Sequence, residues 1–369
     1  MRIDGFDYDL PQDLIAQEPA GRRDESRLLA ISREEPLVCA QHRFADLTDL
    51  LKAGDLVVVN DTRVLPSRIW ASRGSGGVIE ILLVAPQDSS PLGSSAPPLW
   101  RAMVRPARRV RPGDELTLLS THDEGDGTRD EAPEVIIEVA ADLGGGQRAL
   151  TFPAGCDVEG LLESVGSMPL PPYILRDRDD PRGAIDRRRY QTVYACQPGA
   201  IAAPTAGLHF TPELMQRLGA AGIEHTSLTL HVGLGTFQPI RTDDVEDHEM
   251  EAERYEIPQQ AVDAIEQARA RGGRVVAVGT TVVRTLEYAA RATADGRLVA
   301  GHGSADLYIL PGFTFRVVDA MITNFHLPRS TPMLLVSALA GRERLLAAYR
   351  VAIEAGFRFY SYGDAMLVL

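Results

Sequence analysis

The hydrophobic pattern changes character along the chain. Between Val64 and Phe152, short apolar runs alternate with turn-rich segments, and no long helical pattern interrupts them. The runs are VLPSRIW, VIEILLV, LWRAMV, ELTLL, EVIIEVA and ALTF. Short β-rich runs that are bounded by turn residues are typical of antiparallel strands. We therefore predict a small antiparallel barrel or sandwich in this part of the chain.

After Phe152 the pattern becomes that of an α/β protein. Helices are predicted after Thr211, from Pro258 to Gly272, after Gly279, after Thr331 and after Gly341. Strands are predicted for LVVVN at 56–60, IEHTSLTLHV at 223–232, RVVAV at 274–278, DLYIL at 306–310 and FRVVDAMI at 315–322. This alternation predicts a mixed, mostly parallel sheet that is flanked by helices.

The first 60 residues or so have no hydrophobic periodicity of their own and end in the buried strand LVVVN. We assign them to the α/β domain, which is then discontinuous and comprises residues 1–63 and 153–369. The β-rich unit, residues 64–152, is predicted to be an insert. Two connections within it, 86–98 and 121–133, are rich in Pro, Ser and Gly or in acids, as is typical of solvated loops.

Composition excludes several classes of protein. The chain has 369 residues, of which 44% are hydrophobic and 24% charged, as in ordinary globular proteins. No apolar run approaches the roughly 18–20 residues of a membrane span, and the acidic N-terminus does not resemble a signal peptide. We therefore expect a cytoplasmic protein that does not interact with membranes. The three cysteines are far apart, so neither a disulfide framework nor a zinc or iron–sulfur site is expected.

The charge distribution leaves room for local binding of nucleic acid. The net charge of −13 excludes a uniformly basic surface, but eight acids lie between Asp243 and Glu256 alone. One arginine cluster without acids comprises Arg101, Arg105, Arg108, Arg109 and Arg111. A second, 176–189, is flanked by Tyr173, Tyr190 and Tyr194, which could stack on exposed bases. The alternative is ordinary surface charge with the tyrosines in the core.

A strand–turn–helix motif at 275–287, VVAVGTTVVRTLE, is a candidate anion site. Gly279, Thr280 and Thr281 would offer free backbone N–H groups and two hydroxyls at a helix N-terminus. The alternative is a normal turn in which threonine caps the helix. Neither a GxGxxG dinucleotide motif nor a phosphate loop is present.

Histidines lie beside Gly, Pro or aromatic residues where predicted elements end. His209, His231 and His326 occur in PTAGLHF, LTLHVGLGTFQ and NFHLP, and loops at strand ends commonly carry binding sites. Each could instead have a purely structural role. The acidic run holds a further group, Glu246-Asp247-His248, that could serve as acid and base or form a solvated face.

Taken together, these segments resemble the S-adenosylmethionine:tRNA ribosyltransferase-isomerase family of the queuosine pathway, nearly from end to end. The matching segments include FDYDLPQDLIAQEP, VVVNDTRVLPSR, MPLPPYI, RYQTVYA, PGAIAAPTAGLHF, LTLHVGLGTFQPI, EDHEMEAERYEIP, VVAVGTTVVRTLE, VVDAMITNFHLPRSTPMLLVSALAG and FYSYGDAML. The resemblance implies a larger α/β domain with an inserted β-barrel, a monomer, and no metal. It also implies transfer of the ribosyl part of S-adenosylmethionine, the co-substrate, to the aminomethyl-deazaguanine at the tRNA wobble position. Isomerisation then gives epoxyqueuosine and releases adenine and methionine.

This chemistry assigns roles to the candidate residues as hypotheses. The acid–base candidates are His209, His231, His248, His326, Glu246 and Asp247. The candidates for binding S-adenosylmethionine or shaping its pocket are Gly279, Thr280, Thr281, Arg284, Asp319, Asn324 and Asp364. The candidates for contact with RNA are Asp61, Thr62, Arg63, Tyr190, Gln191, Tyr194, Arg105, Arg108 and Arg109.

Two other functions are compatible with parts of the sequence. The first is a tRNA-binding module without catalysis, although binding alone does not need the Gly- and His-rich loops of the α/β part. The second is a nucleotide-dependent hydrolase or oxidoreductase, which the missing phosphate-loop and dinucleotide motifs disfavour. Release of adenine only in the presence of both S-adenosylmethionine and precursor tRNA would distinguish the transferase from both.

Overall fold

A computed structural model describes residues 1–74, 76–87, 97–119, 135–233, 240 and 242–369. These residues form two compact units. The first contains Met1–Arg63, Pro171–Leu175 and Gln191–Leu369, and the second contains Val64–Leu170 and Arg176–Tyr190.

The first unit is built on a mixed sheet with the strand order β15-β13-β12-β3-β14-β16-β17-β1-β2. The strands are β1 (Arg27–Ile31), β2 (Cys39–Arg43), β3 (Leu56–Asn60), β12 (Glu224–Leu230), β13 (Glu253–Ile257), β14 (Val275–Val278), β15 (Gly301–Ala305), β16 (Ala320–Asn324) and β17 (Ala365–Val368). The central strands β12, β3, β14 and β16 are parallel to one another. The outer pairs are antiparallel, apart from β1 with β17. A separate two-stranded sheet pairs β4 (Thr62–Val64) with β11 (Gln197–Ala200).

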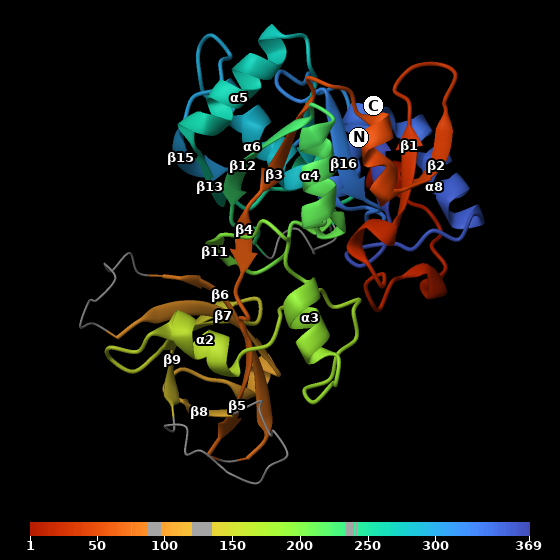
Figure 1. The fold of residues 1–369 in the computed structure, drawn as a ribbon. Helices are drawn as coiled ribbons and strands as arrows, with labels where there is room; N and C mark the ends of the chain where they lie inside the picture. Colours follow the sequence, from red (N-terminus) through yellow and green to blue (C-terminus); the bar gives the residue numbers. More distant parts are fainter. Residues whose placement is uncertain (75, 88–96, 120–134, 234–239, 241) are drawn as a thin grey trace. The chain divides into compact units, whose positions relative to one another are not determined.

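Helices cover both faces of this sheet (Figure 1). They are α1 (Leu47–Leu50), α4 (Pro212–Ala220), α5 (Gln259–Ala270), α6 (Thr280–Arg291), α7 (Thr331–Ala340) and α8 (Arg342–Glu354). The side chains of β3 alternate between the faces: Leu56 and Val58 pack with α5 to α8, whereas Val57 and Val59 pack with α1 and α4. Because both faces are covered, the central strands β3 (LVVVN) and β14 (VVAV) are nearly continuous apolar runs.

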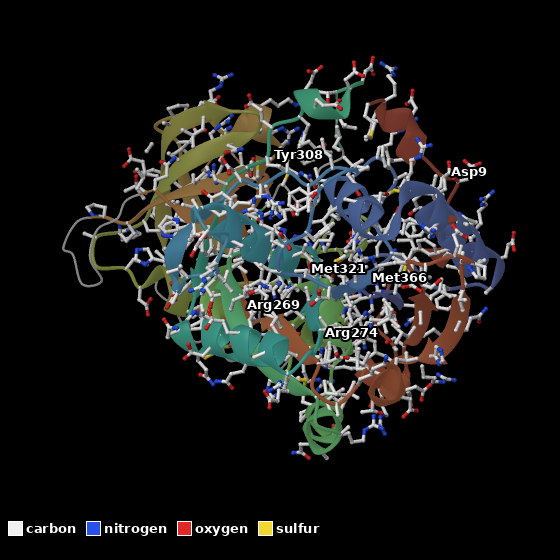
Figure 2. All side chains as sticks on the ribbon, turned by 90° about the horizontal axis from the view of Figure 1, so that it is seen from above. Asp9, Arg269, Arg274, Tyr308, Met321 and Met366 are labelled. Carbon is white, nitrogen blue, oxygen red and sulfur yellow. The ribbon has the colours of Figure 1, made fainter. Side chains whose placement is uncertain are left out.

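The two apolar layers are tightly packed. Met321 on β16 and Met366 on β17 are completely buried and lie among densely packed side chains (Figure 2). Short 3-10 helices connect the larger elements of this unit: η1 (Ile3–Phe6), η2 (Gln12–Leu14), η3 (Arg23–Glu25), η4 (Phe44–Asp46), η6 (Thr205–His209) and η8 (Val245–Asp247). Within the described ranges, no helix has both the length and the apolar character needed to cross a membrane.

The second unit contains the predicted antiparallel barrel. Six strands close it in the order β10-β7-β6-β5-β8-β9. They are β5 (Arg68–Arg73), β6 (Val78–Pro86), β7 (Leu99–Arg105), β8 (Glu115–Leu119), β9 (Ile136–Gly144) and β10 (Gln147–Thr151), with η5 (Ala107–Arg109) between β7 and β8. All six runs predicted from the sequence become strands, and the barrel prediction is confirmed.

The second unit extends beyond the predicted insert of residues 64–152. It also includes α2 (Val158–Val165), since Val158 and Leu162 pack into the barrel core. It further includes α3 (Gly183–Arg189), beside which Arg176 forms an ion pair with the buried Asp186 at 2.6 Å. Residues 153–170 and 176–190 therefore fold with the barrel and not with the α/β part.

Two expectations about the sheet need correction. DLYIL at 306–310 is not a strand, and the neighbouring Gly301–Ala305 pairs with β13 instead. Leu307, Tyr308 and Ile309 contribute their apolar surface to a cavity wall and to the core without joining the strand ladder. The sheet is also less parallel than expected, because four of its eight strand pairings are antiparallel.

Candidate active site

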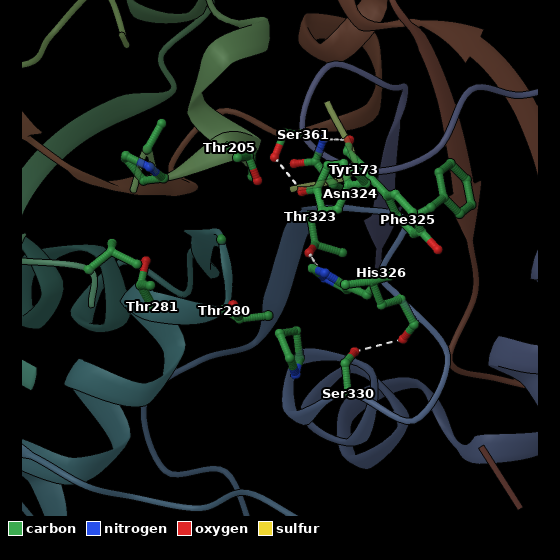
Figure 3. A pocket seen from close by; sticks show the side chains of 18 residues that line it. Tyr173, Thr205, Thr280, Thr281, Thr323, Asn324, Phe325, His326, Ser330 and Ser361 are labelled. Atoms are coloured by element: carbon green, nitrogen blue, oxygen red, sulfur yellow. Dashed lines mark hydrogen bonds between the residues drawn. The ribbon is translucent and has the colours of Figure 1, made fainter. Parts of the chain in front are cut away.

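A cavity of about 630 Å³, including its open mouth, lies in the first unit at the carboxyl ends of β14 and β16 (Figure 3). Open α/β sheets commonly bind ligands at this edge. Loops from distant parts of the sequence form its walls. The lining residues are Tyr173, Ala203 to Ala206, Val232, Gly279 to Thr281, Thr323 to Leu327, Ser330, Pro332, Tyr360 and Ser361.

Two helices begin at one wall of this cavity. Gly279, the residue before α6, has a φ of 92° and provides no side-chain cap, so the first N–H groups of α6 have no partner within the helix. Ser330, the residue before α7, does not cap its helix either, because its hydroxyl donates to the carbonyl oxygen of Leu327 at 2.7 Å. Two uncapped N-termini at one wall favour an anionic group such as a carboxylate.

A second cavity, of about 340 Å³, shares Thr280, Thr281 and Pro332 with the first. Its other walls are mainly apolar and include Leu307, Ile309 and Leu335. Thr281 Oγ1 and Tyr308 Oη are buried and have no hydrogen-bond partner in the part of the chain that the structure describes. Buried hydroxyls without partners are uncommon, and a bound ligand is a usual explanation for them. The two cavities together therefore fit an elongated ligand with one apolar arm.

Aromatic and amide side chains form the opposite wall of the first cavity. The rings of Tyr173 and Tyr360 are 4.7 Å apart between centroids, and Tyr173 Oη lies 2.7 Å from Ser361 Oγ. Asn324 lies beside them, at the end of β16. Burial raises the pKa of Tyr360 to about 12, so its hydroxyl is protonated at neutral pH. This wall offers flat ring surfaces together with a polar amide edge.

His326 lies between these walls (Figure 3). Its Nε2 is 2.7 Å from Thr323 Oγ1, while its Nδ1 has no partner among the described residues. Burial lowers the pKa of His326 to about 3, so the ring is neutral over the physiological range. Its backbone is fixed from two sides, by hydrogen bonds to the hydroxyls of Tyr349 and Tyr8.

The other candidate histidines do not line the first cavity. His209 is only 4% exposed, and burial together with Arg358 and Arg23 lowers its pKa to about 3. His231 Nδ1 lies 2.9 Å from Thr62 Oγ1, and burial lowers the pKa of this ring. His248 packs against the ring of Tyr308 with centroids 5.5 Å apart, and burial lowers its pKa as well.

The shifted histidines predict how stability depends on pH. His209 and His326 have pKa values lowered from 6.5 to about 3, so below pH 6.5 the unfolded chain binds more protons than the folded one. Their stabilising contribution is complete above pH 6.5 and is lost as the pH falls towards 3. Each histidine adds up to about 1.4 kcal/mol per pH unit to the slope of the unfolding free energy.

Urea unfolding between pH 7.5 and 4.5 measures this slope. We expect His326→Gln to have a shallower slope than the unmodified protein, whereas His225→Gln, at an exposed position, should keep the original slope. Identical slopes in all three proteins would contradict the assigned burial of His326.

Two acidic candidates lie outside the cavities. The Glu246 carboxylate contacts the N-terminal ammonium of Met1 at 2.6 Å, and this bond lowers the pKa of Glu246. Asp247 is exposed. Neither residue lines either cavity, so the structure gives both an ordinary surface environment.

Arg284 and Asp319, which were expected to contact the substrate, are both engaged with other parts of the protein. Arg284 lines the second cavity, but its guanidinium is paired with the buried Glu253. Burial lowers the pKa of Arg284 to about 10, at which it is still charged near neutrality. Asp319 precedes β16, at the opposite end of that strand from Asn324, and accepts a hydrogen bond from the Val275 backbone. Asp319 therefore orders the strand starts and does not reach the cavity.

Asp364 does not line the cavity, but it holds in place a loop that forms part of the cavity wall. Its carboxylate accepts hydrogen bonds from the backbone N–H groups of Arg27 at 2.9 Å and Arg358 at 2.8 Å. These bonds hold the 358–364 loop against β1, and this loop carries Tyr360 and Ser361 into the cavity wall.

The candidates for RNA contact differ in how far they are buried. The Asp61 carboxylate accepts from the hydroxyls of Ser227 and Thr229, and Thr62 is buried against His231. Tyr190 is completely buried in the second unit, so it cannot stack on a base in this conformation. Arg63, Gln191 and Tyr194 are half-buried. The expected role of Tyr190 is therefore corrected to a structural one.

Of the two arginine clusters, the one in the barrel is accessible. Arg105, at the end of β7, and Arg108 and Arg109, in η5, are exposed. The cluster at 176–189 is partly internal, since Arg176 pairs with Asp186 and Arg182 pairs with Asp180 at 2.6 Å in each case. Arg187 also pairs with Glu163 at 2.8 Å, so ion pairs hold at least three of the six arginines of this cluster.

Several cavity residues had not been singled out from the sequence. They are Thr205, Thr323, Ser330, Tyr360 and Ser361, whereas Tyr173 had been considered for stacking on exposed bases. Tyr173 and Tyr360 are part of the family-like segments MPLPPYI and FYSYGDAML, and Thr323 directly precedes Asn324. Gly235, within LTLHVGLGTFQ, lies outside the described residues. Among the residues that are described, no group of three His, Cys, Asp or Glu side chains could hold a metal ion.

Comparisons with known proteins agree with this architecture. The model of the family described as "Queuosine biosynthesis protein" matches residues 3–368. An S-adenosylmethionine:tRNA ribosyltransferase-isomerase from Thermus thermophilus is 49% identical over 367 residues, covering 100% of this chain and 99% of its own. One from Trichlorobacter lovleyi is 45% identical over 369 residues and covers 100% of both chains.

A solved structure is also similar. The crystal structure of S-adenosylmethionine tRNA ribosyltransferase from Thermotoga maritima has 34% sequence identity and a TM-score of 0.53, over 99% of this chain and 100% of that one. With a family match over nearly the whole length and full-length relatives at 45–49% identity, the chain belongs to the queuosine biosynthesis family of S-adenosylmethionine:tRNA ribosyltransferase-isomerases.

Proposed function

We propose that this enzyme transfers the ribosyl moiety of S-adenosylmethionine to the aminomethyl-deazaguanine at the wobble position of tRNA. It then isomerises that group to epoxyqueuosine and releases adenine and methionine. The observation that carries the proposal is the first cavity, which combines helix N-termini, a neutral histidine and paired tyrosine rings. S-adenosylmethionine has a carboxylate at its methionine end, the sulfonium and ribose in the middle, and a flat adenine at the other end. These groups match the helix N-termini, the histidine and the tyrosine rings in that order.

The methionine end of the substrate fits the wall at which α6 and α7 begin. Its carboxylate would accept hydrogen bonds from the free N–H groups there and from the Thr281 hydroxyl. The apolar side chains of the second cavity would contact its methylene groups. Arg284 adds positive charge nearby, although its pairing with Glu253 makes it a secondary contributor.

The first chemical step removes a proton from the ribose carbon that is bonded to the sulfonium. His326 is the proposed base, because it is the one of the four candidate histidines that lines the first cavity. In the tautomer in which Nε2–H donates to Thr323 Oγ1, the lone pair of Nδ1 is available to accept the proton. Adenine then departs, the neutral RNA amine attacks, and closure of the epoxide expels methionine.

The RNA-bound amine belongs to a tRNA that already carries the queuosine precursor, which is therefore the proposed macromolecular partner. We propose that the enzyme works as a monomer in the cytoplasm and requires no metal. Arg105, Arg108 and Arg109 of the barrel are the proposed phosphate contacts, since they are exposed and none of the residues between them is acidic.

These contacts predict a change in salt dependence. Replacing Arg108 with Gln should reduce the slope of log binding constant against log salt concentration by about one unit, as expected for one lost phosphate contact. Titration of precursor tRNA by fluorescence anisotropy at several salt concentrations measures the slope. Arg271→Gln is the control. Arg271 lies in the first unit, where it pairs with Glu224 at 2.8 Å, and its replacement should leave the slope unchanged. An unaltered slope for Arg108→Gln would remove this residue from the RNA surface.

The test of the proposed function is the appearance of adenine. The protein is incubated with S-adenosylmethionine alone, with precursor-bearing tRNA alone, and with both. Chromatography should detect free adenine and methionine only when both substrates are present, and the tRNA should gain the mass of the epoxycyclopentanediol. Tight binding of tRNA without release of adenine would instead identify a non-catalytic binding module.

A further inference from the structure

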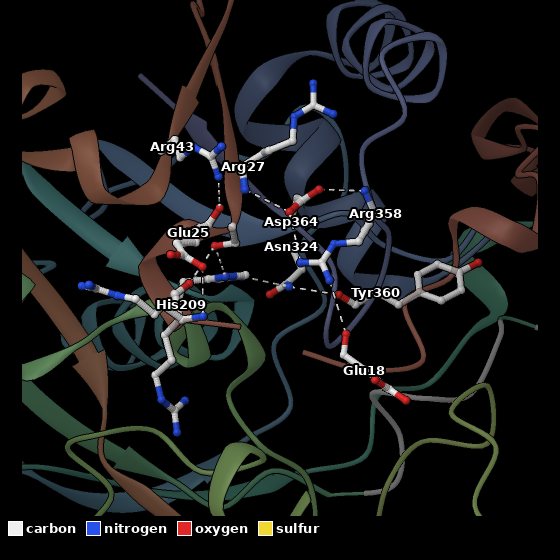
Figure 4. A network of polar contacts seen from close by, with 12 residues as sticks. Glu18, Glu25, Arg27, Arg43, His209, Asn324, Arg358, Tyr360 and Asp364 are labelled. Carbon is white, nitrogen blue, oxygen red and sulfur yellow. Dashed lines mark hydrogen bonds and ion pairs between the residues drawn. The ribbon is translucent and has the colours of Figure 1, made fainter. Parts of the chain in front are cut away.

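A buried hydrogen-bond chain connects three segments that are far apart in the sequence (Figure 4). It joins Ser26, which precedes β1, to His209 at the end of η6, and His209 to Asn324 at the end of β16. All three side chains are at most 4% exposed. Of the three residues, Asn324 lines the cavity.

The direction of every bond in this chain is determined. The Ser26 hydroxyl donates its hydrogen to the Arg23 carbonyl oxygen at 3.0 Å, so it accepts from His209 Nδ1–H at 2.7 Å. His209 Nε2 then carries a lone pair and accepts from Asn324 Nδ2 at 3.3 Å. The ring is neutral, in agreement with its lowered pKa. Phe44 packs on the imidazole with centroids 5.1 Å apart and restricts its rotation.

The orientation of the Asn324 amide follows from its partners. The Tyr360 backbone oxygen can only accept a hydrogen bond, and it takes one from Asn324 Nδ2 at 3.0 Å. Both hydrogens of the amide nitrogen are thus occupied, by Tyr360 and by His209. Asn324 Oδ1 is left buried without a partner among the described residues, in a side chain that lines the cavity.

We infer that Asn324 Oδ1 accepts a hydrogen bond from the 6-amino group of the adenine that is released, and that His209 and Ser26 are positioning residues for this contact. The inference rests on the proposed function. Asn324 lies on the same wall as Tyr173, opposite the helix starts at Thr280 and Ser330 (Figure 3), and its amide nitrogen donates to the Tyr360 backbone oxygen. With the methionine end at the helix starts, the base reaches the tyrosine wall. An acceptor there distinguishes an amino group from an oxo group, because two facing acceptors would leave both oxygens unpaired.

The experiment compares S-adenosylmethionine with its hypoxanthine analogue, in which an oxygen replaces the 6-amino group. Release of the base is measured with precursor tRNA for the unmodified enzyme and for Asn324→Ala. We expect the enzyme to prefer adenine, and Asn324→Ala to reduce that preference in kcat/KM by roughly 10- to 100-fold. Intrinsic differences between the leaving groups cancel in this comparison. Equal preferences in the two proteins would overturn the inference.

His209→Phe and Ser26→Ala should weaken the preference in the same direction, mainly through a raised KM for the donor. His209→Gln offers an acceptor oxygen and should restore part of it. A purely structural role would lower activity with both donors alike. Asn60→Ala is the matched control, because the Asn60 amide is buried, bonded to the backbone of Leu230 and Thr62, and outside the cavity lining.

A measurement on the unmodified enzyme covers the case in which these variants fail to fold. Free adenine should inhibit the reaction at least about tenfold better than free hypoxanthine, for the same hydrogen-bonding reason. Equal inhibition by the two bases would overturn the inference while leaving the proposed function intact. If S-adenosylmethionine yields no adenine at all with precursor tRNA, the proposed function itself fails.

Discussion

His326→Gln is expected to reduce the rate of adenine release by roughly 10²- to 10⁴-fold, the range typical for loss of a general base. Glutamine is close to histidine in size and keeps a polar group near Thr323, but it cannot accept a proton at neutral pH. Binding of S-adenosylmethionine should change little, since the walls that contact its two ends stay in place. Single-turnover assays of adenine release, together with binding measurements, separate the two effects.

His225→Gln is the control, because His225 is exposed on β12 and does not line either cavity. It should retain the activity of the unmodified enzyme. If His326→Gln also retained full turnover, proton abstraction would have to be assigned to another group.

Glu253→Gln is expected to destabilise the fold by about 3–5 kcal/mol, because it leaves the Arg284 guanidinium buried without a counter-charge. The Glu253 and Arg284 side chains are only 6% and 8% exposed, so water cannot replace the lost carboxylate. The carboxylate also accepts a hydrogen bond from the Gly233 backbone at 2.8 Å. Urea unfolding at pH 7.5 measures the change in the free energy of unfolding.

Glu256→Gln provides the comparison on the same strand, since Glu256 is exposed and should alter the stability by less than about 0.5 kcal/mol. A loss below about 1 kcal/mol for Glu253→Gln would show that the buried pair does not need its negative partner.

The barrel was predictable because its strands each have one face in the core and one in solvent. The helices of the α/β part were predictable from their start signals, such as Thr211 before Pro212 in α4, where the threonine hydroxyl accepts from the Leu214 N–H. β2 and β15 were missed because edge strands such as CAQHR and GHGSA have little apolar pattern. Their pairing is determined by the neighbouring strands, which a local pattern does not reveal.

The candidate site was also predictable only in part. Gly279, Thr280, Thr281, Asn324 and His326 follow strands, and the ends of parallel strands meet at one edge of a sheet. Tyr173 and Tyr360 lie on loops far apart in the sequence, and only the fold brings their rings together. The histidines look alike in sequence, yet burial makes His209 a partner of Asn324 and leaves His326 at the cavity.

The central claim is that S-adenosylmethionine lies across the two cavities, with its methionine end at the starts of α6 and α7. A crystal structure with a precursor-bearing anticodon stem-loop and the unreactive analogue sinefungin tests it most directly. We predict that the amino acid carboxylate lies within hydrogen-bond distance of the Thr281 backbone N–H or hydroxyl, and the adenine beside Tyr173 and Tyr360. Density for the analogue elsewhere, with the Thr281 and Asn324 side chains untouched, would contradict the account.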